Sequence, residues 1–540
     1  MTRGRPADGT QDLGALVTAS SAPDGARLEV RSPFDGRLLA ALPRSTPEDA
    51  CEALARARAA QPAWAARPAR ERAAVLDRFE VLLADHRDEM LDWIQQETGK
   101  NRASALEEFA DTVLWAHDVA RRAPRLLADR RRAGAFPVLT RTVVRHVPRG
   151  VVAVIAPWNY PLALPIGDAL PALAAGNAVV LKPDSQTPDT ALLAVSLLRR
   201  AGLPAEVLQV VVGPGRELGP VLTGSIADEG VRVAGSGRSP GAGEGSRAGA
   251  DFLMFTGSSA TGRELGRACA DRLIGFAAEL GGKNPLLVLS DADPVRAAAG
   301  AVQAAFSNTG QLCLSIERAY VDDAVWDRFV PALVERTRGL RLGAGTEWDI
   351  DMGSLTGAAQ LRKVTAHVED ARAKGATVLA GGRPRPDLGP FFYEPTLLAD
   401  VTPDMAVFSE ETFGPVLSLF RVASDEEAIQ AANASEYGLN ASVWSRSASH
   451  ARAVAERLRA GTVNLNEGYA AAWASHDAPM GGMGISGVGR RHGDEGILEY
   501  TEPQTIAAQR LVPVAGPAGV GHEQWGRLLM RGVRVLRRLR

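Results

Sequence analysis

The sequence predicts an α/β protein in which parallel strands alternate with crossover helices. Residues 45–130 are rich in Ala, Arg, Glu and Leu, and their apolar residues recur at three- and four-residue spacing, which is typical of amphipathic helices. From about residue 150, short apolar runs bounded by turn residues alternate with helical stretches, and a second α/β stretch follows from about 290 to 470. The apolar runs are VVAVIAP, AVVLKP, VLQVVVG, FLMFTG and NPLLVL.

Length, charge and cysteine content narrow the class of protein. With 540 residues, 46% of them hydrophobic, the chain can bury a large core, and more than one domain is expected. The net charge of −2 gives no overall attraction to nucleic acid or to anionic lipid, so no nucleic-acid partner is expected. Three cysteines do not make a disulfide framework, and the N-terminal residues lack an apolar signal segment, so we expect a cytoplasmic location.

Three segments have an unusual composition. Residues 162–181 are the most apolar stretch, but Asp168, Asn177 and two prolines interrupt it, so it is interpreted as a buried helix followed by a strand. Residues 234–250 contain only Gly, Ala, Ser, Arg, Pro and Glu and are interpreted as a disordered surface insertion. The C-terminal basic tail, residues 508–540, is either a solvated helix packed on the body or a basic amphipathic helix that touches a membrane or an acidic partner. Its arginines are Arg527, Arg531, Arg534, Arg537, Arg538 and Arg540.

The first candidate for chemistry is Cys313, at the end of the phrase NTGQLC. A lone cysteine is usually an inert, buried small residue. A nucleophilic cysteine must instead be accessible, and it needs either a lowered pKa or a neighbouring base. Asn308, Thr309 and Gly310 predict a turn just before Cys313, which is a suitable place to expose its sulfur.

Three polar residues each allow a structural and a functional interpretation, and two of them, Asn159 and Lys182, follow or end strand-like runs. Glu279, beside two glycines, is either a turn residue or a desolvated carboxylate suited to general base catalysis. Asn159 in PWNYP is either a turn former or an amide that donates to an oxyanion. Lys182 in KPDS is either a charged strand end or a ligand for ribose or phosphate.

Glycine patterns add a weaker signal for a nucleotide. FTGSSATG follows a strand and enters a helix, and Gly257 and Gly262 would permit a pyrophosphate to approach the helix N-terminus closely. The spacing is not the GxGxxG fingerprint, and GPGRELG at residues 213–219 lacks the third glycine at the right place. This pattern alone does not establish a cofactor site.

Taken together, the segments resemble the aldehyde dehydrogenase superfamily. The phrases PWNYP, LKPDSQTP, FTGS, ELGGKNP, NTGQLC and ETFGPV occur in the family's order and at suitable separations. The resemblance covers roughly residues 30–510. The longer phrases GQLCLSIER, GTVNLNEGYA and PMGGMGISGVGRRHG are similar to bacterial NADP-dependent succinate-semialdehyde dehydrogenases.

The resemblance implies a role for each matching residue. Cys313 would be the nucleophile that forms a thiohemiacetal and then a thioester, Glu279 the base for the deacylating water, and Asn159 part of the oxyanion hole. Lys182 and Glu411 would hold the two riboses of NAD(P). The remaining residues expected to line the cofactor site are Trp158, Asn159, Gly257, Ser258 and Leu280.

The family fold implies a division of the chain and an oligomer. A Rossmann-like cofactor domain would comprise 1–130 and 149–280, and a catalytic α/β domain 281–482. A small β extension that pairs between subunits would comprise 131–148 and 483–507. We therefore expect a homodimer or a homotetramer, in which a partner covers the strand RTVVRHVP.

The substrate is less well defined, because the chain departs from some semialdehyde dehydrogenases. Two arginines that hold the distal carboxylate there correspond to Gly167 and Ser307 here, and a resolving cysteine known in some relatives corresponds to Ser315. Succinate semialdehyde is the expected substrate. The alternatives are an uncharged aliphatic or aromatic aldehyde, or a non-catalytic cofactor-binding protein on the same fold.

The cofactor expectation depends on Ser185. Relatives that are strict for NAD often carry a glutamate three residues after the KP lysine, where it binds the adenosine ribose hydroxyls. Here that residue is Ser185, which is small and neutral and leaves space for a 2′-phosphate near Lys182. NADP should therefore be used at least as well as NAD, unless Ser185 is only a turn residue. No metal ligand set is expected.

Overall fold

The computed structural model describes residues 12–19, 27–134, 140–225, 249–510 and 512–539. Most of the insertion predicted at 234–250 lies outside these residues. Gly249 and Ala250 are described, and Ala250 is buried with its N–H donating to Leu222 O at 2.9 Å. None of the described helices is long and apolar enough to cross a membrane.

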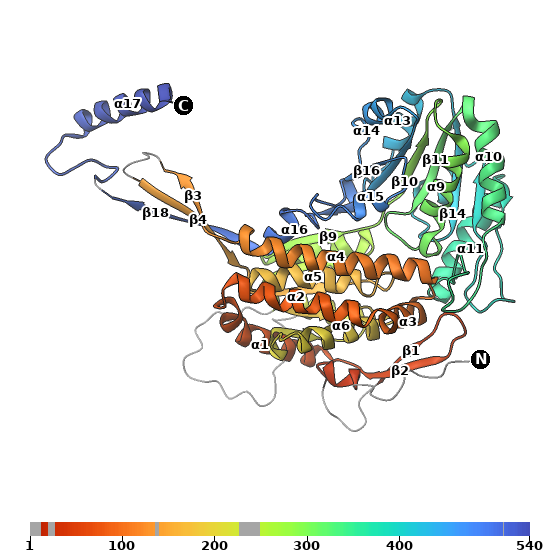
Figure 1. Cartoon of the computed structure of the whole chain (residues 1–540), viewed down its shortest axis with the longest axis horizontal. Helices are drawn as coiled ribbons and strands as arrows, with labels where there is room; N and C mark the ends of the chain where they lie inside the picture. The colour runs from red at the N-terminus through yellow and green to blue at the C-terminus, as the bar shows by residue number, and fades with distance from the viewer. Residues whose placement is uncertain (1–11, 20–26, 135–139, 226–248, 511, 540) are drawn as a thin grey trace.

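The N-terminal region is a layer of helices, as predicted for residues 45–130 (Figure 1). Thr46 and Asp49 form a capping box at the start of α1, and Gly99 in the left-handed conformation ends α3. The helices are α1 Pro47–Ala65, α2 Ala69–Asp85, α3 Arg87–Thr98 and α4 Arg102–Leu126, and a short helix η1 Leu13–Leu16 and a hairpin of β1 Arg27–Arg31 and β2 Leu38–Pro43 precede them.

A six-stranded sheet has the order β17-β9-β8-β5-β6-β7, and all neighbours except β17 and β9 are parallel. Strands β5, β6 and β8 are buried along their whole length, which explains their unbroken apolar sequences. The strands are β5 Val151–Ile155, β6 Ala178–Lys182, β7 Leu208–Val210, β8 Phe252–Thr256, β9 Gly275–Glu279 and β17 Gly487–Val488. The connecting helices are α5 Ala163–Ala175, α6 Pro188–Arg200, η2 Ala205–Val207, α7 Gly215–Thr223 and α8 Ser259–Asp271.

A seven-stranded sheet has the order β12-β13-β14-β11-β10-β15-β16, with only β12 antiparallel to its neighbour. Its strands are β10 Asn284–Val288, β11 Ile316–Asp322, β12 Thr377–Ala380, β13 Thr396–Ala399, β14 Val416–Val422, β15 Asn440–Trp444 and β16 Thr462–Leu465. Its helices are α9 Pro294–Phe306, η3 Ser307–Gly310, α10 Asp323–Arg338, α11 Ala358–Ala373, α12 Ala406–Ser409, α13 Asp425–Asn433, α14 Ala448–Ala455 and α15 Ala470–Trp473. The α/β prediction and the strands at the five apolar runs are thus confirmed.

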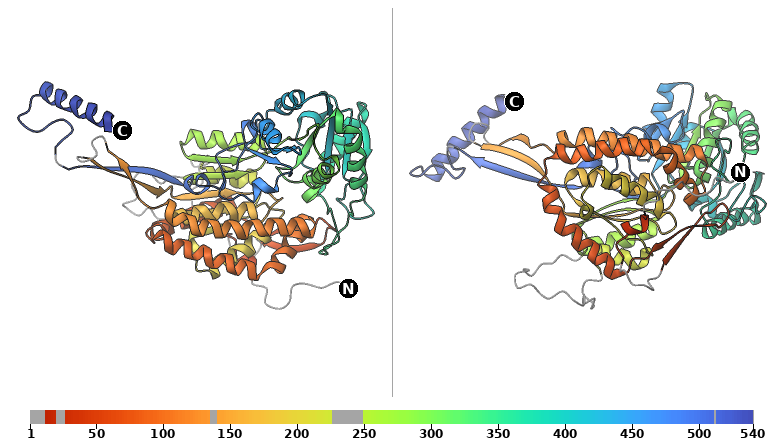
Figure 2. Two further views of the ribbon diagram at one scale, coloured as in Figure 1. Left: turned by 45° about the horizontal axis from the view of Figure 1, so that its top comes forward. Right: turned by 60° about the horizontal axis from the view of Figure 1, so that its bottom comes forward.

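A three-stranded antiparallel sheet projects from the body as a flap (Figures 1 and 2). It has the order β18-β4-β3, where β3 is Arg130–Ala133, β4 is Thr140–Pro148 and β18 is Thr501–Gln509. Strand β4 confirms that RTVVRHVP forms a strand, but the expectation that a partner covers its open edge is wrong, because β4 is the central strand and pairs with β18 on one side and β3 on the other. Beyond Thr501, every residue of β18 is exposed. The short elements η4 Gly484–Ser486 and α16 Glu495–Leu498 precede β18, and α17 His522–Leu539 follows it.

The carboxyl ends of four neighbouring strands bring the sequence motifs together. In the order β9-β8-β5-β6, these ends lead to Glu279, Gly257, Asn159 and Lys182. Parallel strands present their carboxyl ends on one edge of a sheet, and this edge is where α/β proteins bind ligands. The chain then passes from Glu279 into β10 of the second sheet, which places the edge between the two sheets (Figure 1).

Candidate active site

Cys313 follows a turn of unusual backbone conformation. Asn308, Thr309 and Gly310 have φ values of +49°, +58° and +68°, so three successive residues adopt the left-handed region. Such conformations are costly for residues other than glycine and persist only where the surroundings impose them. The predicted turn before Cys313 is confirmed, and it leaves Cys313 partly exposed.

Close packing imposes this turn. A Cβ on Gly310 would lie 2.2 Å from Gly414 O, so only glycine fits there. The Asn308 N–H donates to Ser104 Oγ at 3.0 Å, and its side-chain amide donates to Asn159 O at 3.2 Å and Gln311 O at 3.0 Å. The turn is therefore tied both to α4 and to the loop that carries Asn159.

Asn159 is buried beside the turn. Its Nδ2 donates to Gln311 O at 3.0 Å, which aims the amide toward the cysteine turn and leaves one N–H for another acceptor. The backbone N–H of Cys313 makes no hydrogen bond to another described residue. Two donors are therefore available near the sulfur, which is the arrangement that an oxyanion requires.

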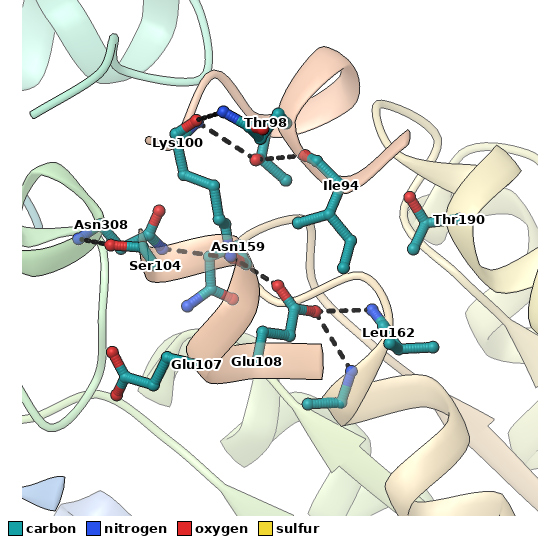
Figure 3. Close-up of polar contacts among 12 residues, drawn as sticks. Ile94, Thr98, Lys100, Ser104, Glu107, Glu108, Asn159, Leu162, Thr190 and Asn308 are labelled. Atoms are coloured by element: carbon teal, nitrogen blue, oxygen red, sulfur yellow. Dashed lines mark hydrogen bonds and ion pairs between the residues drawn. The ribbon is translucent and has the colours of Figure 1, made fainter. Parts of the chain in front are cut away.

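A buried ion pair supports Asn159 from behind (Figure 3). Lys100 Nζ lies 2.6 Å from Glu108 Oε2, donates to Asn159 O at 2.8 Å and stands 3.9 Å from the centroid of the Tyr160 ring. Glu108 Oε1 accepts from the Leu162 N–H at 2.7 Å. The sequence analysis did not predict this pair. The usable signal was a lysine just before α4 and a glutamate on the buried face of that helix.

Lys100→Met should destabilise the protein and slow it. Methionine keeps the apolar stem but leaves Glu108 buried without its counter-ion, which should lower the unfolding free energy by about 3–5 kcal/mol. A displaced Asn159 should lower kcat by about 10²-fold with a smaller change in KM. Urea unfolding and steady-state kinetics test this. The control is Arg452→Met, which breaks an exposed pair with Glu456 and should cost less than about 1 kcal/mol. Equal losses in both variants would contradict the role of Lys100.

Glu279, the last residue of β9, is a buried carboxylate. Its Oε2 has no hydrogen-bond partner among the described residues, and a Cβ on Gly481 would lie 2.8 Å from its Oε1. Burial raises the pKa of Glu279 to about 8, and the charge of Arg491 opposes part of this effect. Arg491 itself is held by Asp168 through two hydrogen bonds of 2.7 and 2.6 Å. A carboxyl group with this pKa can accept and release a proton near neutral pH.

The Cys313 thiol is not acidified by its surroundings. Burial of the sulfur raises the pKa of Cys313 to about 12, and the negative charge of Glu279 adds to this shift. Glu279 is thus near enough to Cys313 for its charge to affect the thiol. Of the two routes to a reactive cysteine, the structure therefore favours a neighbouring base over a lowered thiol pKa.

Lys182, the last residue of β6, and Ser185, which follows it, lie at the end of this sheet edge that is farthest from Glu279. Lys182 is 4% exposed, and burial lowers its pKa. Its Nζ makes one long hydrogen bond, to Pro183 O at 3.3 Å, and a Cβ on Gly215 at the start of α7 would lie 4.0 Å from its Cε. The Ser185 hydroxyl is buried without a partner among the described residues. These unfilled polar groups fit the ribose or phosphate of a nucleotide.

The other predicted cofactor residues lie between these ends. Ser258 caps α8, with its hydroxyl accepting from the Thr261 N–H, and Gly262 packs so closely on Leu280 that a Cβ there would clash at 2.6 Å. The Gly257 N–H donates to Glu279 O at 3.1 Å.

Glu411 and Trp158 complete the set. Glu411 Oε1 accepts from the Gly282 N–H at 2.7 Å, and burial raises the pKa of Glu411 to about 7. Trp158 meets Phe413 edge to face, with ring centroids 5.6 Å apart. Every predicted residue thus lies along one edge between the two sheets.

Comparison with known proteins identifies the family. The model of the aldehyde dehydrogenase family matches residues 19–239 and 227–506. The chain belongs to the aldehyde dehydrogenase family. A Mycolicibacterium smegmatis protein named as a candidate succinate-semialdehyde dehydrogenase [NADP(+)] is 50% identical over 94% of this chain and 93% of its own length.

Of two further relatives, one has the same enzyme name and the other a different one. The crystal structure of succinate-semialdehyde dehydrogenase from Burkholderia pseudomallei superposes with a TM-score of 0.82 at 36% identity, covering 90% of this chain and 95% of that one. A 3-sulfolactaldehyde dehydrogenase from Pseudomonas putida is 37% identical over 89% of this chain and 93% of its own length. The aldehyde dehydrogenase fold expected from the sequence is confirmed.

The apolar cluster beside Cys313 was not predicted. In this aldehyde dehydrogenase, Cys313 packs against a cluster that includes Tyr160, Leu164 and Trp473, and the Tyr160 and Trp473 rings lie 6.0 Å apart. These residues come from two parts of the chain, since Tyr160 and Leu164 lie around the start of α5 and Trp473 ends α15. The only signal of Tyr160 and Trp473 in the sequence was their aromatic character, which does not distinguish a substrate wall from an ordinary core.

A cluster of buried polar residues lies near the apolar cluster, with the His492 ring 6.1 Å from the Trp473 ring. Asp111, His476 and His492 place ligand-type atoms within 4.8 Å of one another, and His476 Nε2 lies 2.8 Å from Asp111 Oδ1. Burial, His476 and Arg491 hold the pKa of His492 well below its usual range. The His492 ring also packs on Trp115 at 4.7 Å. Because Arg491 adds positive charge here, we interpret the cluster as a packed group with a neutral His492 and assign no metal to it.

Proposed function

We propose that this aldehyde dehydrogenase oxidises succinate semialdehyde to succinate with NADP⁺, using Cys313, Asn159 and Glu279. The observation that supports the mechanism is the left-handed turn at 308–310, which sets Cys313 beside the Asn159 amide and within the electrostatic influence of Glu279. The relatives' names support the substrate and the cofactor.

In the first half of the reaction, the Cys313 sulfur adds to the aldehyde carbon. Because the pKa of the Cys313 thiol is raised to about 12, its proton passes to the Glu279 carboxylate, which the raised pKa of about 8 makes a suitable acceptor. The carbonyl oxygen becomes an oxyanion that the Asn159 Nδ2 and the Cys313 N–H stabilise. One such donor contributes about 10²–10³ in rate.

In the second half, water hydrolyses the acyl–sulfur bond. That bond is formed when the oxyanion of the adduct collapses to the Cys313 thioester with loss of a hydride from the substrate carbon, for which the nicotinamide of bound NADP⁺ would supply the acceptor. Glu279 loses the proton it took from Cys313 to solvent and then takes a proton from the attacking water. The oxyanion forms again beside the same pair of donors and collapses, which breaks the carbon–sulfur bond and releases the carboxylic acid. The Cys313 thiolate that leaves takes back the proton from Glu279.

We assign Lys182, Ser185 and Glu411 to the two riboses of the cofactor, with Trp158, Gly257, Ser258 and Leu280 lining the same edge. The buried Lys182 ammonium and the unpartnered Ser185 hydroxyl support the adenosine end. Ser185 leaves room for the 2′-phosphate of NADP⁺ and places no carboxylate against it. With NAD⁺, a serine in place of glutamate loses only one contact. This difference supports NADP⁺ as the cofactor, with NAD⁺ as a poorer alternative.

Ser185→Glu should sharply reduce kcat/KM for NADP⁺ and leave that for NAD⁺ close to wild type. A carboxylate placed against a phosphate in a partly desolvated site costs several kcal/mol, which corresponds to at least about 10²-fold in kcat/KM. Steady-state kinetics with both cofactors measure the ratio. Ser185→Gln is the matched control, since it has glutamate's size without its charge. A Gln variant as defective with NADP⁺ as the Glu variant would show that size, not charge, decides.

The substrate proposal is tested by kcat/KM for succinate semialdehyde against hexanal and benzaldehyde, followed at 340 nm. A clear preference for succinate semialdehyde is the expected result. One observation favours uncharged aldehydes instead: Gly167 and Ser307 supply no cation, and Tyr160 and Trp473 lie beside Cys313. A preference for hexanal or benzaldehyde would therefore replace the proposed substrate while leaving the thioester mechanism in place.

The division into domains and the oligomer are also proposals. The six-stranded sheet supports a cofactor domain and the seven-stranded sheet a catalytic domain. Within the expected extension 483–507, β17 pairs with β9 of the six-stranded sheet, so we assign only β18 of that segment to the flap. The flap presents β18 as an edge strand with exposed residues, including Ile506, which is 50% exposed. An unpaired edge of this length is normally covered. We therefore propose that the flap pairs with a second subunit in a homodimer or homotetramer.

A further inference from the structure

Helix α17, His522–Leu539, separates apolar and basic residues onto opposite faces. At about 100° per residue, Trp525, Leu528, Leu529, Val533 and Val535 share one face. Arginines occupy the other face, and the described ones that are exposed there are Arg527, Arg531, Arg534 and Arg537. Glu523 is the only acidic residue of the helix, and it lies 3.3 Å from Arg527.

The apolar face of α17 has no cover in the described structure. Leu528 is 48% exposed, Val533 44% and Val535 57%. These are large apolar side chains gathered on two adjacent turns, whereas single exposed apolar residues need no explanation. A covering surface is therefore expected.

The position of α17 leaves both faces accessible. The helix lies beside the outer part of the flap and apart from the α/β body in every view (Figures 1 and 2). It is fixed to its own linker, because Trp525 Nε1 donates to Val514 O at 2.8 Å and the Trp525 ring packs on Gly516. The helix can thus meet another surface without any change in the body.

We infer that α17 binds a bilayer surface with anionic phosphate headgroups and lies in its plane. A basic helix with one apolar face inserts that face at the boundary of the acyl chains, while its arginines reach the headgroup phosphates. Guanidinium groups pair well with phosphate oxygens. None of the described helices can cross a membrane, so α17 binds the surface and does not span the bilayer.

A second copy of this chain is a poorer occupant. Its net charge of −2 over 540 residues offers no excess of negative charge to a row of arginines. An anionic bilayer supplies both a continuous apolar layer and a dense layer of negative charge. The apolar face of α17 matches the acyl layer, and its arginine face matches the negatively charged headgroup layer.

The experiment is co-sedimentation of the full-length protein with two kinds of vesicle. One kind is phosphatidylcholine alone, and the other is phosphatidylcholine mixed with phosphatidylglycerol. We expect binding to the mixed vesicles, little binding to phosphatidylcholine, and release at high salt because the attraction is electrostatic. Removal of residues 521–540 should abolish binding and leave aldehyde oxidation in solution unchanged.

Three variants separate the two faces. Arg531→Gln with Arg534→Gln should lower the partition coefficient about fivefold for each arginine removed. Leu529→Gln with Val533→Gln should lower it on mixed vesicles while keeping the charge. Met530→Gln is the matched control, because Met530 is 55% exposed and lies on the arginine face, so this loss of an apolar side chain should change nothing.

Three outcomes would overturn the inference. The first is no binding to mixed vesicles at low salt. The second is equal binding of both vesicle types. The third is that removal of 521–540 leaves vesicle binding unchanged but gives a smaller oligomer by ultracentrifugation, which would make α17 a contact between subunits. Because all of these readouts use binding or assembly, they are independent of the proposed substrate.

Discussion

Cys313→Ala abolishes aldehyde oxidation and leaves cofactor binding intact, if the proposed mechanism is right. Alanine has no nucleophile, and the two other cysteines lie on other elements than the site, Cys51 in α1 and the buried Cys269 in α8. Loss of a covalent nucleophile lowers kcat by more than about 10⁴-fold. The measurements are absorbance at 340 nm with saturating aldehyde and NADP⁺, and calorimetric titration of NADP⁺.

The matched control is Cys269→Ala, which removes a thiol of the same kind from α8 and should retain activity. Wild-type enzyme incubated with aldehyde and cofactor should also carry a covalent acyl group on the peptide that contains Cys313, detectable by mass spectrometry. Substantial turnover by the alanine variant, or an acyl group found on Cys51 instead, would refute the thioester mechanism at Cys313.

Glu279→Gln should slow hydrolysis of the thioester more than its formation. Glutamine keeps the size of the side chain but cannot accept a proton, and loss of a general base costs about 10²–10⁴-fold. Stopped-flow absorbance should show a burst of reduced cofactor close to one per active site, followed by slow turnover. A single linear phase with wild-type kcat would contradict the role of Glu279.

The pH dependence gives a second readout on the same residue. Since the pKa of Glu279 is raised to about 8, the active carboxylate form increases with pH, and wild-type turnover should rise up to about pH 8 and then level off. The Gln variant should lack this rise.

The free energy of unfolding should fall as pH rises, whereas turnover should increase. A carboxyl group with a raised folded-state pKa binds its proton more tightly in the folded than in the unfolded chain. Its contribution is therefore present at low pH and is lost as pH rises to about 8. Above pH 8, Glu279→Gln should melt at a higher temperature than wild type. A lower melting temperature there would show that the Glu279 ion is compensated by partners.

The sequence by itself determined the layered α/β fold and the candidate residues, because both depend on local signals. Runs such as residues 151–155 and 178–182 are apolar throughout since those strands are buried on both faces, and periodicity suffices to find the helices of 45–130. The turn before Cys313 was also local, because Asn and Gly tolerate left-handed backbone.

Only the tertiary structure decided how these residues work together. The raised pKa of Glu279 results from burial by residues of other segments, among them Gly481, whereas the sequence around Glu279 left a turn residue and a desolvated carboxylate both open. The support of Asn159 by Lys100, and the exposed apolar face of α17, likewise depend on which segments meet and which do not. Desolvation and ion pairing act across space, so they are settled when the chain folds and not by the order of its residues.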